Sequence, residues 1–158
     1  MVASVMRFPG WVRPAHRWFV LLGGACVIGG GLVSAAMAPA ATYHSSWAVA
    51  YIVLVAGVAQ VALGLGQAGL VGEDLPRWVL RSELVGWNLG NAAVVAGTLL
   101  DVTLALYVGC ALLVAALGLV LYAIRNAQPG RTLVTIRAIV VLLLISMPVG
   151  VVLQAATH

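Results

Sequence analysis

The sequence LVGWNLGNAAVVAGTLLDVTLALYVGCALLVAALGLVLYAI, residues 84–124, contains one charged residue, Asp101. As a single straight helix it would be about 60 Å long, at about 1.5 Å per residue. The whole chain is 63% hydrophobic and 8% charged, which is too apolar for a soluble domain and indicates a bilayer as its surroundings. Because the hydrocarbon core of a bilayer is only about 30 Å thick, we expect the chain to turn back at Asp101. The stretch therefore predicts two membrane-spanning helices, over residues 82–100 and 102–124.

Three further apolar runs predict spans over residues 18–37, 47–71 and 132–155. The polar segments between them contain proline or glycine, as is typical of loops. The first run is about 20 residues long, enough to span a membrane, so we expect a retained signal anchor although residues 34–38 resemble a cleavage site. The sequence thus predicts an all-α fold, a polytopic transmembrane helix bundle over residues 18–156, preceded by a basic cytoplasmic segment over residues 1–17.

The basic residues determine the expected orientation. All eight are arginine, and all eight fall on one side of the membrane only if the chain turns at Asp101. They are Arg7, Arg13, Arg17, Arg77, Arg81, Arg125, Arg131 and Arg137. Such a bias marks the cytoplasmic side, so we expect five spans in the plasma (inner) membrane, with the N-terminus inside and the C-terminus outside. The arginines flank apolar spans and form no basic face with stacking aromatic residues, so the expected partner is the lipid bilayer and not nucleic acid.

Small residues predict the faces through which the helices pack, since helices in lipid associate by close contact. Among these stripes are Cys26, Gly30 and Ser34 in the first span, Gly57, Gln60, Gly64 and Gln67 in the second, and Ala111, Ala115, Gly118 and Tyr122 in the fourth. We expect each stripe to face a neighbouring helix.

Four amide side chains in the second and third spans are candidates for a binding site: Gln60, Gln67, Asn88 and Asn91. An unpaired amide near the middle of the membrane costs a few kcal/mol, so Gln60 and Asn91 need partners. In one interpretation they bond to each other across the interface of the two spans. In the alternatives, the four amides line a polar cavity for a substrate, a quinone or an ion, or they bind another subunit.

Glu83 and Asp101 are the acids closest to a span, and acids inside a membrane are candidates for function because burying their charge is costly. Both fall at predicted helix ends. Glu83 is expected in the first turn of its helix, where the helix dipole favours a negative charge and Arg81 is close in sequence. Asp101 is expected to form the hairpin turn and to cap the next helix. A proton relay is the alternative role for each.

The histidines give little support for a cofactor. None lies within a predicted span, whereas transmembrane haem needs axial ligands there. His44 and His158 both fall on the expected outer side and are the candidates for a metal or haem edge, but two ligands make an incomplete site. We therefore predict no metal site and no cofactor.

The cysteines and the short sequence motifs also give no support for a functional site. Cys26 and Cys110 fall at similar depths, so a disulfide is conceivable, but we expect two separate packing thiols. The chain contains none of the common metalloprotease, phosphate-binding or nucleophile motifs, so the sequence indicates no enzyme activity.

Some segments resemble a known group of proteins. They are HRWF at residues 16–19, YHSSWAVAY at residues 43–51 and WNLGN at residues 87–91. With the complete absence of lysine, they resemble the small, uncharacterised integral membrane proteins of high-GC actinobacteria such as mycobacteria. The resemblance extends over most of the chain and implies no functional residue.

The short loops leave no room for a soluble catalytic or receptor domain, so we expect the work of the protein to be done within the bilayer. The first expectation is a small non-catalytic subunit or assembly partner of a larger membrane complex. One alternative is a small transporter or channel acting as an oligomer, which water reaching Gln60 and Asn91 would mark. The other is a redox-linked haem- or quinone-binding membrane protein.

Overall fold

The computed structural model describes residues 14–71 and 75–156, and their side chains over residues 16–71 and 75–147. The described residues are helical and contain no strand. The helices are α1 (Pro14–Met37), the short 3₁₀ helix η1 (Ala38–Ala40), α2 (Tyr43–Tyr51), the π-helix η2 (Ile52–Ala59), α3 (Gln60–Ala68), α4 (Arg77–Leu99), α5 (Thr103–Ala123) and α6 (Arg131–Ala156).

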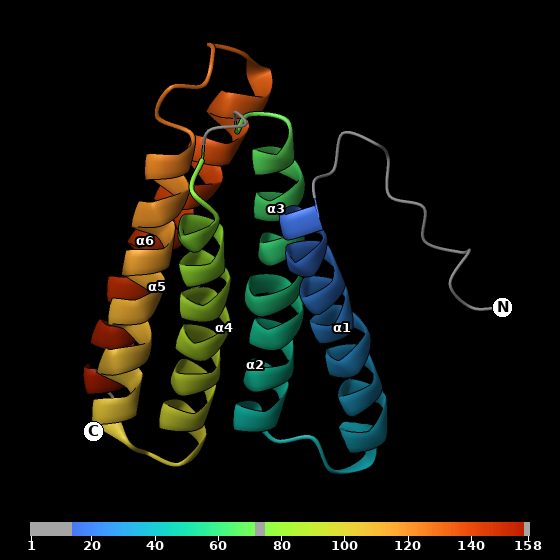
Figure 1. Cartoon of the computed structure of the whole chain (residues 1–158). Helices are drawn as coiled ribbons and strands as arrows, with labels where there is room; N and C mark the ends of the chain where they lie inside the picture. Colours follow the sequence, from blue (N-terminus) through green and yellow to red (C-terminus); the bar gives the residue numbers. More distant parts are fainter. Residues whose placement is uncertain (1–13, 72–74, 157–158) are drawn as a thin grey trace, which may run out of the picture.

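These elements make five long antiparallel rods, because α2, η2 and α3 run on as one continuous helix (Figure 1). α1 packs along η2 and α3, α4 pairs closely with α5, and α6 packs against α5 and α3. The prediction of an all-α bundle with five helices is confirmed.

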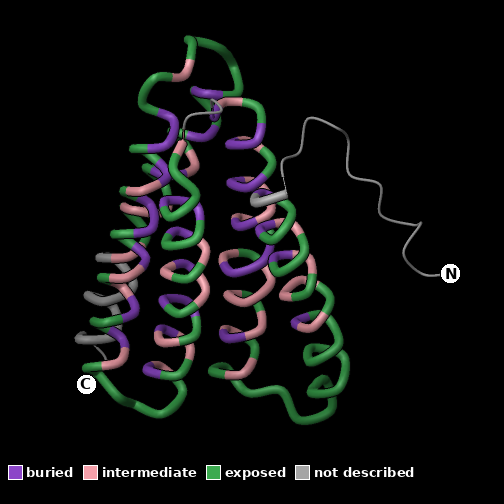
Figure 2. The backbone as a smooth tube through the Cα atoms, viewed as in Figure 1, coloured by how far each residue is buried: buried purple, intermediate pink, exposed green. Residues whose placement is uncertain are grey.

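The outer surface of the bundle is apolar. The segments His16–Ala40, Tyr43–Ala68 and Thr103–Ala123 are long and apolar enough to cross a membrane. Large apolar side chains on them, such as Ile28 and Leu104, are about 70% exposed, and exposed positions follow the outside of the helices (Figure 2). An exterior rich in exposed apolar side chains is typical of a surface that meets lipid.

The hairpin of α4 and α5 is held together by glycine. A Cβ atom on Gly90 would lie 2.8 Å from the Leu113 Cγ, and one on Gly109 would lie 2.8 Å from the Gly90 carbonyl oxygen. The two backbones are therefore in direct contact, as small residues permit in lipid. Asp101 makes the turn with a φ of 55°, a left-handed conformation that aspartate tolerates better than most residues. The predicted turn at Asp101 is confirmed.

The expected packing faces are correct in the second rod and wrong in α5. Gly57 and Gly64 are buried, and a Cβ on Gly64 would lie 2.5 Å from the Phe19 Cβ of α1. In α5 the predicted stripe of Ala111, Ala115, Gly118 and Tyr122 is exposed. The buried face of α5 carries Gly109, Leu113, Ala116 and Leu117 among others. On α1, Gly30 lies in the interface, Cys26 is half-buried and Ser34 is exposed.

Three helices begin four or five residues before the predicted spans. α1 begins at Pro14, α2 at Tyr43 and α4 at Arg77. The start of α2 is set by a capping box, in which the Ser45 N–H donates to Thr42 Oγ1 at 3.2 Å and the Thr42 N–H donates to Ser45 Oγ at 2.9 Å. The apolar runs predict the part of each helix that is expected to lie in the membrane, whereas the observed helices extend beyond those runs into polar sequence. Such extension is ordinary because backbone hydrogen bonding, not hydropathy, ends a helix.

The described arginines gather at one end of the bundle. They are Arg17 in α1, Arg77 and Arg81 in α4, Arg125 just after α5, and Arg131 and Arg137 in α6. Figure 1 shows that the start of α1, the end of α3, the start of α4 and the α5–α6 connection lie at this end, opposite the Asp101 turn. Arg7 and Arg13 lie outside the described residues.

Candidate functional site

Buried polar side chains lie along the inward face of α4 and on α3. Gln60 and Gln67 are fully buried, and Glu83, Trp87 and Asn91 are at most 3% exposed. We use the name polar seam for the set of Gln60, Gln67, Glu83, Trp87, Asn91 and Thr98. Two of its members come from α3 and four from α4, so the seam lies where the second rod faces the α4–α5 hairpin.

At the arginine end of the seam, two side chains pair across the helices. Gln67 Nε2 donates a hydrogen bond of 2.6 Å to Glu83 Oε1. Glu83 Oε2 and Gln67 Oε1 are buried and have no hydrogen-bond partner. The expectation that Glu83 lies in the first helical turn beside Arg81 is wrong. α4 begins six residues before Glu83, and this places the carboxyl inside the bundle while Arg81 is exposed.

His16 lies at the same end and is also fully buried. Its carbonyl oxygen is 3.6 Å from the position that a Cβ would take on Gly64, about one turn before Gln67. The sequence did not indicate His16, because it precedes the first apolar run. Its burial could have been expected from its position three residues before Phe19. Residues three apart share a helix face, and Phe19 packs on Gly64.

In the middle of the seam, the expected bond between Gln60 and Asn91 is not formed. Asn91 Nδ2 donates instead to the Trp87 carbonyl oxygen of its own helix at 2.8 Å. Both polar atoms of the Gln60 amide, Asn91 Oδ1 and Trp87 Nε1 are buried without a partner. An asparagine within a helix competes for carbonyls of the preceding turn, and that local bond has displaced the predicted one.

The seam continues toward the Asp101 turn with Thr98, whose Oγ1 is also buried and unpartnered. Glu83 and Thr98 are separated by about 22 Å along the α4 axis, at about 1.5 Å per residue. Since a residue advances by about 100° around a helix, the four α4 members share an arc of about a quarter turn. The unpartnered atoms thus follow a line across most of the depth of a bilayer core.

Asn88 and Asp101, two of the predicted site residues, lie outside the seam. Asn88 is half-buried, and its Nδ2 donates to the Leu84 carbonyl oxygen at 2.8 Å. Asp101 makes the turn, and the residue in the N-cap position of α5 is Val102.

Of the two predicted outer histidines, His44 alone falls within the described residues. His44 is exposed in the first turn of α2, with its ring edge-on to Tyr43 at 5.7 Å, and His158 lies outside the described residues. Within residues 14–71 and 75–156, no group of three or more His, Cys, Asp or Glu side chains gathers to hold a metal. Cys26 and Cys110 are both free thiols.

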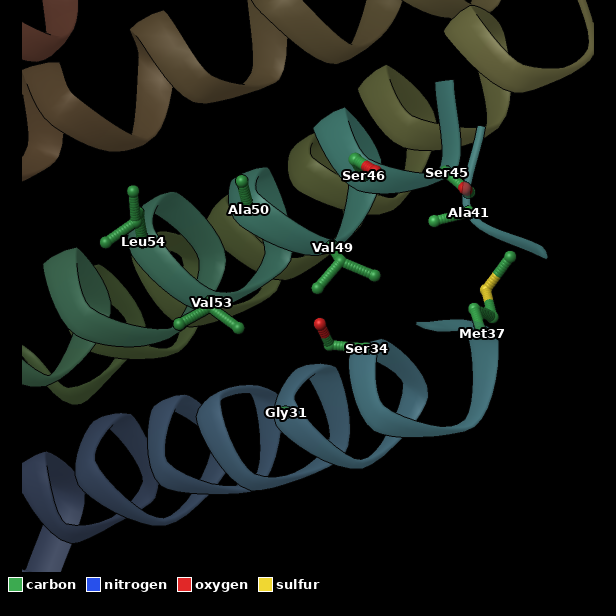
Figure 3. Close-up of a pocket in the computed structure, with 10 residues that line it drawn as sticks. All are labelled: Gly31, Ser34, Met37, Ala41, Ser45, Ser46, Val49, Ala50, Val53 and Leu54. Atoms are coloured by element: carbon green, nitrogen blue, oxygen red, sulfur yellow. The ribbon is translucent and has the colours of Figure 1, made fainter. Parts of the chain in front are cut away.

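A second feature is a groove between the end of α1 and the α2–η2 helix, near the connection that joins them. It has a volume of about 340 Å³. Its lining is Gly31, Ser34, Met37, Ala41, Ser45, Ser46, Val49, Ala50, Val53 and Leu54. Figure 3 shows the Ser34 hydroxyl directed from α1 toward Val49. No predicted site residue lines this groove.

Comparisons of the chain with protein-family models, with curated proteins and with solved structures found no match.

Proposed function

We propose that this protein spans the plasma membrane five times, with the N-terminus inside and the C-terminus outside, and that it transports a small polar species along the polar seam. The gathering of the described arginines at one end supports the orientation, because a positive end faces the cytoplasm. Three rods have the length and apolarity of spans. α4 is less apolar because it carries Glu83, Asn88 and Asn91, and it pairs with α5 along much of its length.

One observation carries the transport proposal: seven buried polar side-chain atoms of the seam have no hydrogen-bond partner. Leaving one such atom unsatisfied costs about 1–3 kcal/mol, and native proteins satisfy about 90% or more of their buried polar groups. A row of such atoms on facing helices is therefore a site for water or for a small polar solute. Each bound water supplies about three hydrogen bonds, and connected waters would join Glu83 to Thr98.

Flux through vesicles tests this proposal. The purified protein is placed in lipid vesicles that contain a pH-sensitive dye, and the internal pH is followed after a pH step. We expect Gln60→Leu, which replaces a seam amide by an apolar side chain of similar size, to reduce proton flux at least about tenfold. A barrier increase of about 1.4 kcal/mol is enough for that change.

Asn88→Leu is the matched control, because Asn88 is an amide of the same bundle whose bond is local to α4. We expect its flux to equal that of the unchanged protein. Equal proton flux for both variants, or no proton flux from the unchanged protein, would contradict a proton-conducting path through the seam.

A second candidate function is that of a small subunit or assembly partner of a larger membrane complex. It is favoured by the exposed face of α5 that contains Ala111, Ala115 and Gly118, since small residues let a further helix approach closely. Purification in mild detergent followed by native mass spectrometry distinguishes the two. A stable complex with a different protein supports the subunit role, whereas a homo-oligomer or a monomer supports independent transport.

A further inference from the structure

We propose that Glu83 is the proton-binding group of the seam and that Gln67 positions its carboxyl. This proposal rests on the proposed transport function, because the proton would then be the species that moves along the seam. Proton binding at Glu83 can nevertheless be measured in the absence of any flux.

The geometry leaves one carboxyl oxygen available for a proton. Gln67 Nε2 holds Glu83 Oε1 through its 2.6 Å hydrogen bond. Glu83 Oε2 is buried and unpartnered, within a residue that is 1% exposed. A carboxylate inside a membrane needs a proton or a positive partner, and the hydrogen-bond donor that the structure places on Glu83 is a neutral amide.

The proposed step exchanges one O–H bond for another. A hydronium ion arriving from the arginine end gives a proton to Glu83 Oε2. One O–H bond of the hydronium breaks and leaves a water molecule, while a new O–H bond forms on the carboxylate and neutralises its negative charge. Release breaks the same O–H bond and returns the proton to a water molecule of the seam. No electron pair leaves the protein, and no other reactant is required.

Few other titratable groups surround this position. α3 and η2 carry none. α1 contributes His16, fully buried near the level of Gln67, and the exposed Arg17. The other arginines at this end of the bundle, on and beside α4, α5 and α6, are exposed. Glu83 and His16 are thus the two buried titratable side chains that this end of the described chain provides.

A metal cation fits this position less well than a proton does. Hard cations take about six or more oxygen ligands. At the level of Glu83 the unpartnered buried oxygens are Glu83 Oε2 and Gln67 Oε1, far fewer than such a coordination shell requires. One oxygen is sufficient for a proton.

Labelling with dicyclohexylcarbodiimide tests the proposal on the full-length protein in vesicles without a pH gradient. The reagent adds to a protonated carboxyl in apolar surroundings, and mass spectrometry locates the adduct. We expect labelling at Glu83 that decreases as pH rises, and none at that position in Glu83→Gln. Sodium or potassium ions should not protect the site, and protection by either would overturn the proposal in favour of a cation site.

The positioning role of Gln67 is tested through the pH profile of labelling. Gln67→Leu removes a hydrogen bond that favours the charged carboxylate, so we expect the pH of half-labelling to rise by about one unit. Asn88→Leu should leave the midpoint unchanged. An unchanged midpoint in Gln67→Leu would show that the pair is only a packing contact.

The two proposals fail in different ways. If Glu83 is labelled in a pH-dependent manner but vesicles show no flux, the proton site stands and transport is wrong. If vesicles conduct and Glu83→Gln conducts equally well, transport stands and the proton site is wrong. Labelling of the unchanged protein requires no variant to fold, so a failure to obtain Glu83→Gln leaves the proposal testable.

Discussion

Glu83 shows how a single residue departs from its expected environment. It follows Arg81 and Ser82 in a polar stretch of sequence, yet it is almost completely buried because α4 starts at Arg77 and turns its carboxyl inward. The amides Gln60, Gln67 and Asn91 were predictable as buried polar residues from their place in apolar runs. Their hydrogen-bond partners could not be predicted, because these depend on how two helices align along each other. No short-range sequence pattern specifies that alignment.

We expect the buried pair of Gln67 and Glu83 to lower the free energy of unfolding, as buried polar groups that serve a function often do. Gln67→Leu leaves Glu83 buried without its donor, so we expect a loss of about 1–3 kcal/mol. The double variant Gln67→Leu with Glu83→Leu removes both polar groups at similar volume, and such replacements are often neutral or stabilising. Thermal unfolding in detergent, followed by circular dichroism, should rank the double variant above Gln67→Leu. A double variant less stable than the unchanged protein would instead show that the Gln67–Glu83 hydrogen bond stabilises the fold.

At the scale of the helix, hydropathy and turn residues were enough to predict five rods and the reversal at Asp101. They were not enough to choose the packed face of α5. That helix carries small residues on two sides, Gly109 and Ala116 on one and Ala111, Ala115 and Gly118 on the other, so spacing alone cannot distinguish them. The π-helix η2 lies in the run IVLVAGVA, which gives no sign of a wider turn.

Two glycines of α5 provide a matched test of this packing. A Cβ on Gly109 would meet Gly90 and Val94 backbone atoms at 2.8 Å, whereas one on Gly118 would meet nothing within 4 Å. We expect Gly109→Ala to destabilise the protein by about 1–3 kcal/mol through overpacking. Gly118→Ala should be neutral or stabilising by up to about 1 kcal/mol, because alanine favours the helix. Similar melting temperatures for the two variants would contradict the close contact of α4 and α5.

The turn between α4 and α5 offers a second test at this scale. Asp101 has a φ of 55°, which costs most residues about 1–2 kcal/mol and β-branched residues the most. We therefore expect Asp101→Val to lower the melting temperature more than Asp101→Gly does. The reverse order would contradict a left-handed backbone conformation at this position.

For the molecule as a whole, the separation of charge from apolar surface defines an axis. The described arginines occupy one end and exposed apolar side chains cover the sides, which is the arrangement that the proposed orientation requires. This gathering of arginines depends on the reversal of the chain at Asp101.

Reporter fusions check the five-span orientation. A fusion after Asn126, in the α5–α6 connection, should report the cytoplasmic side, and a fusion at the C-terminus should report the opposite side, because the arginine-rich end stays inside. An insertion at Asp101 is the control and should agree with the C-terminus. Fusions at Asn126 and the C-terminus that report the same side would contradict five spans.

The clustering of arginine also determines how trypsin would divide the protein. With no lysine in the chain, the enzyme can cut only at arginine, and the sites that the structure describes all lie near one end of the bundle. Between Arg17 and Arg77 lie nearly all of α1 and the whole second rod, and between Arg81 and Arg125 lie most of α4 and all of α5. Digestion from that face would thus cut the polypeptide between its hairpins and leave each pair of helices joined at its far end, still held by the contacts of their glycines.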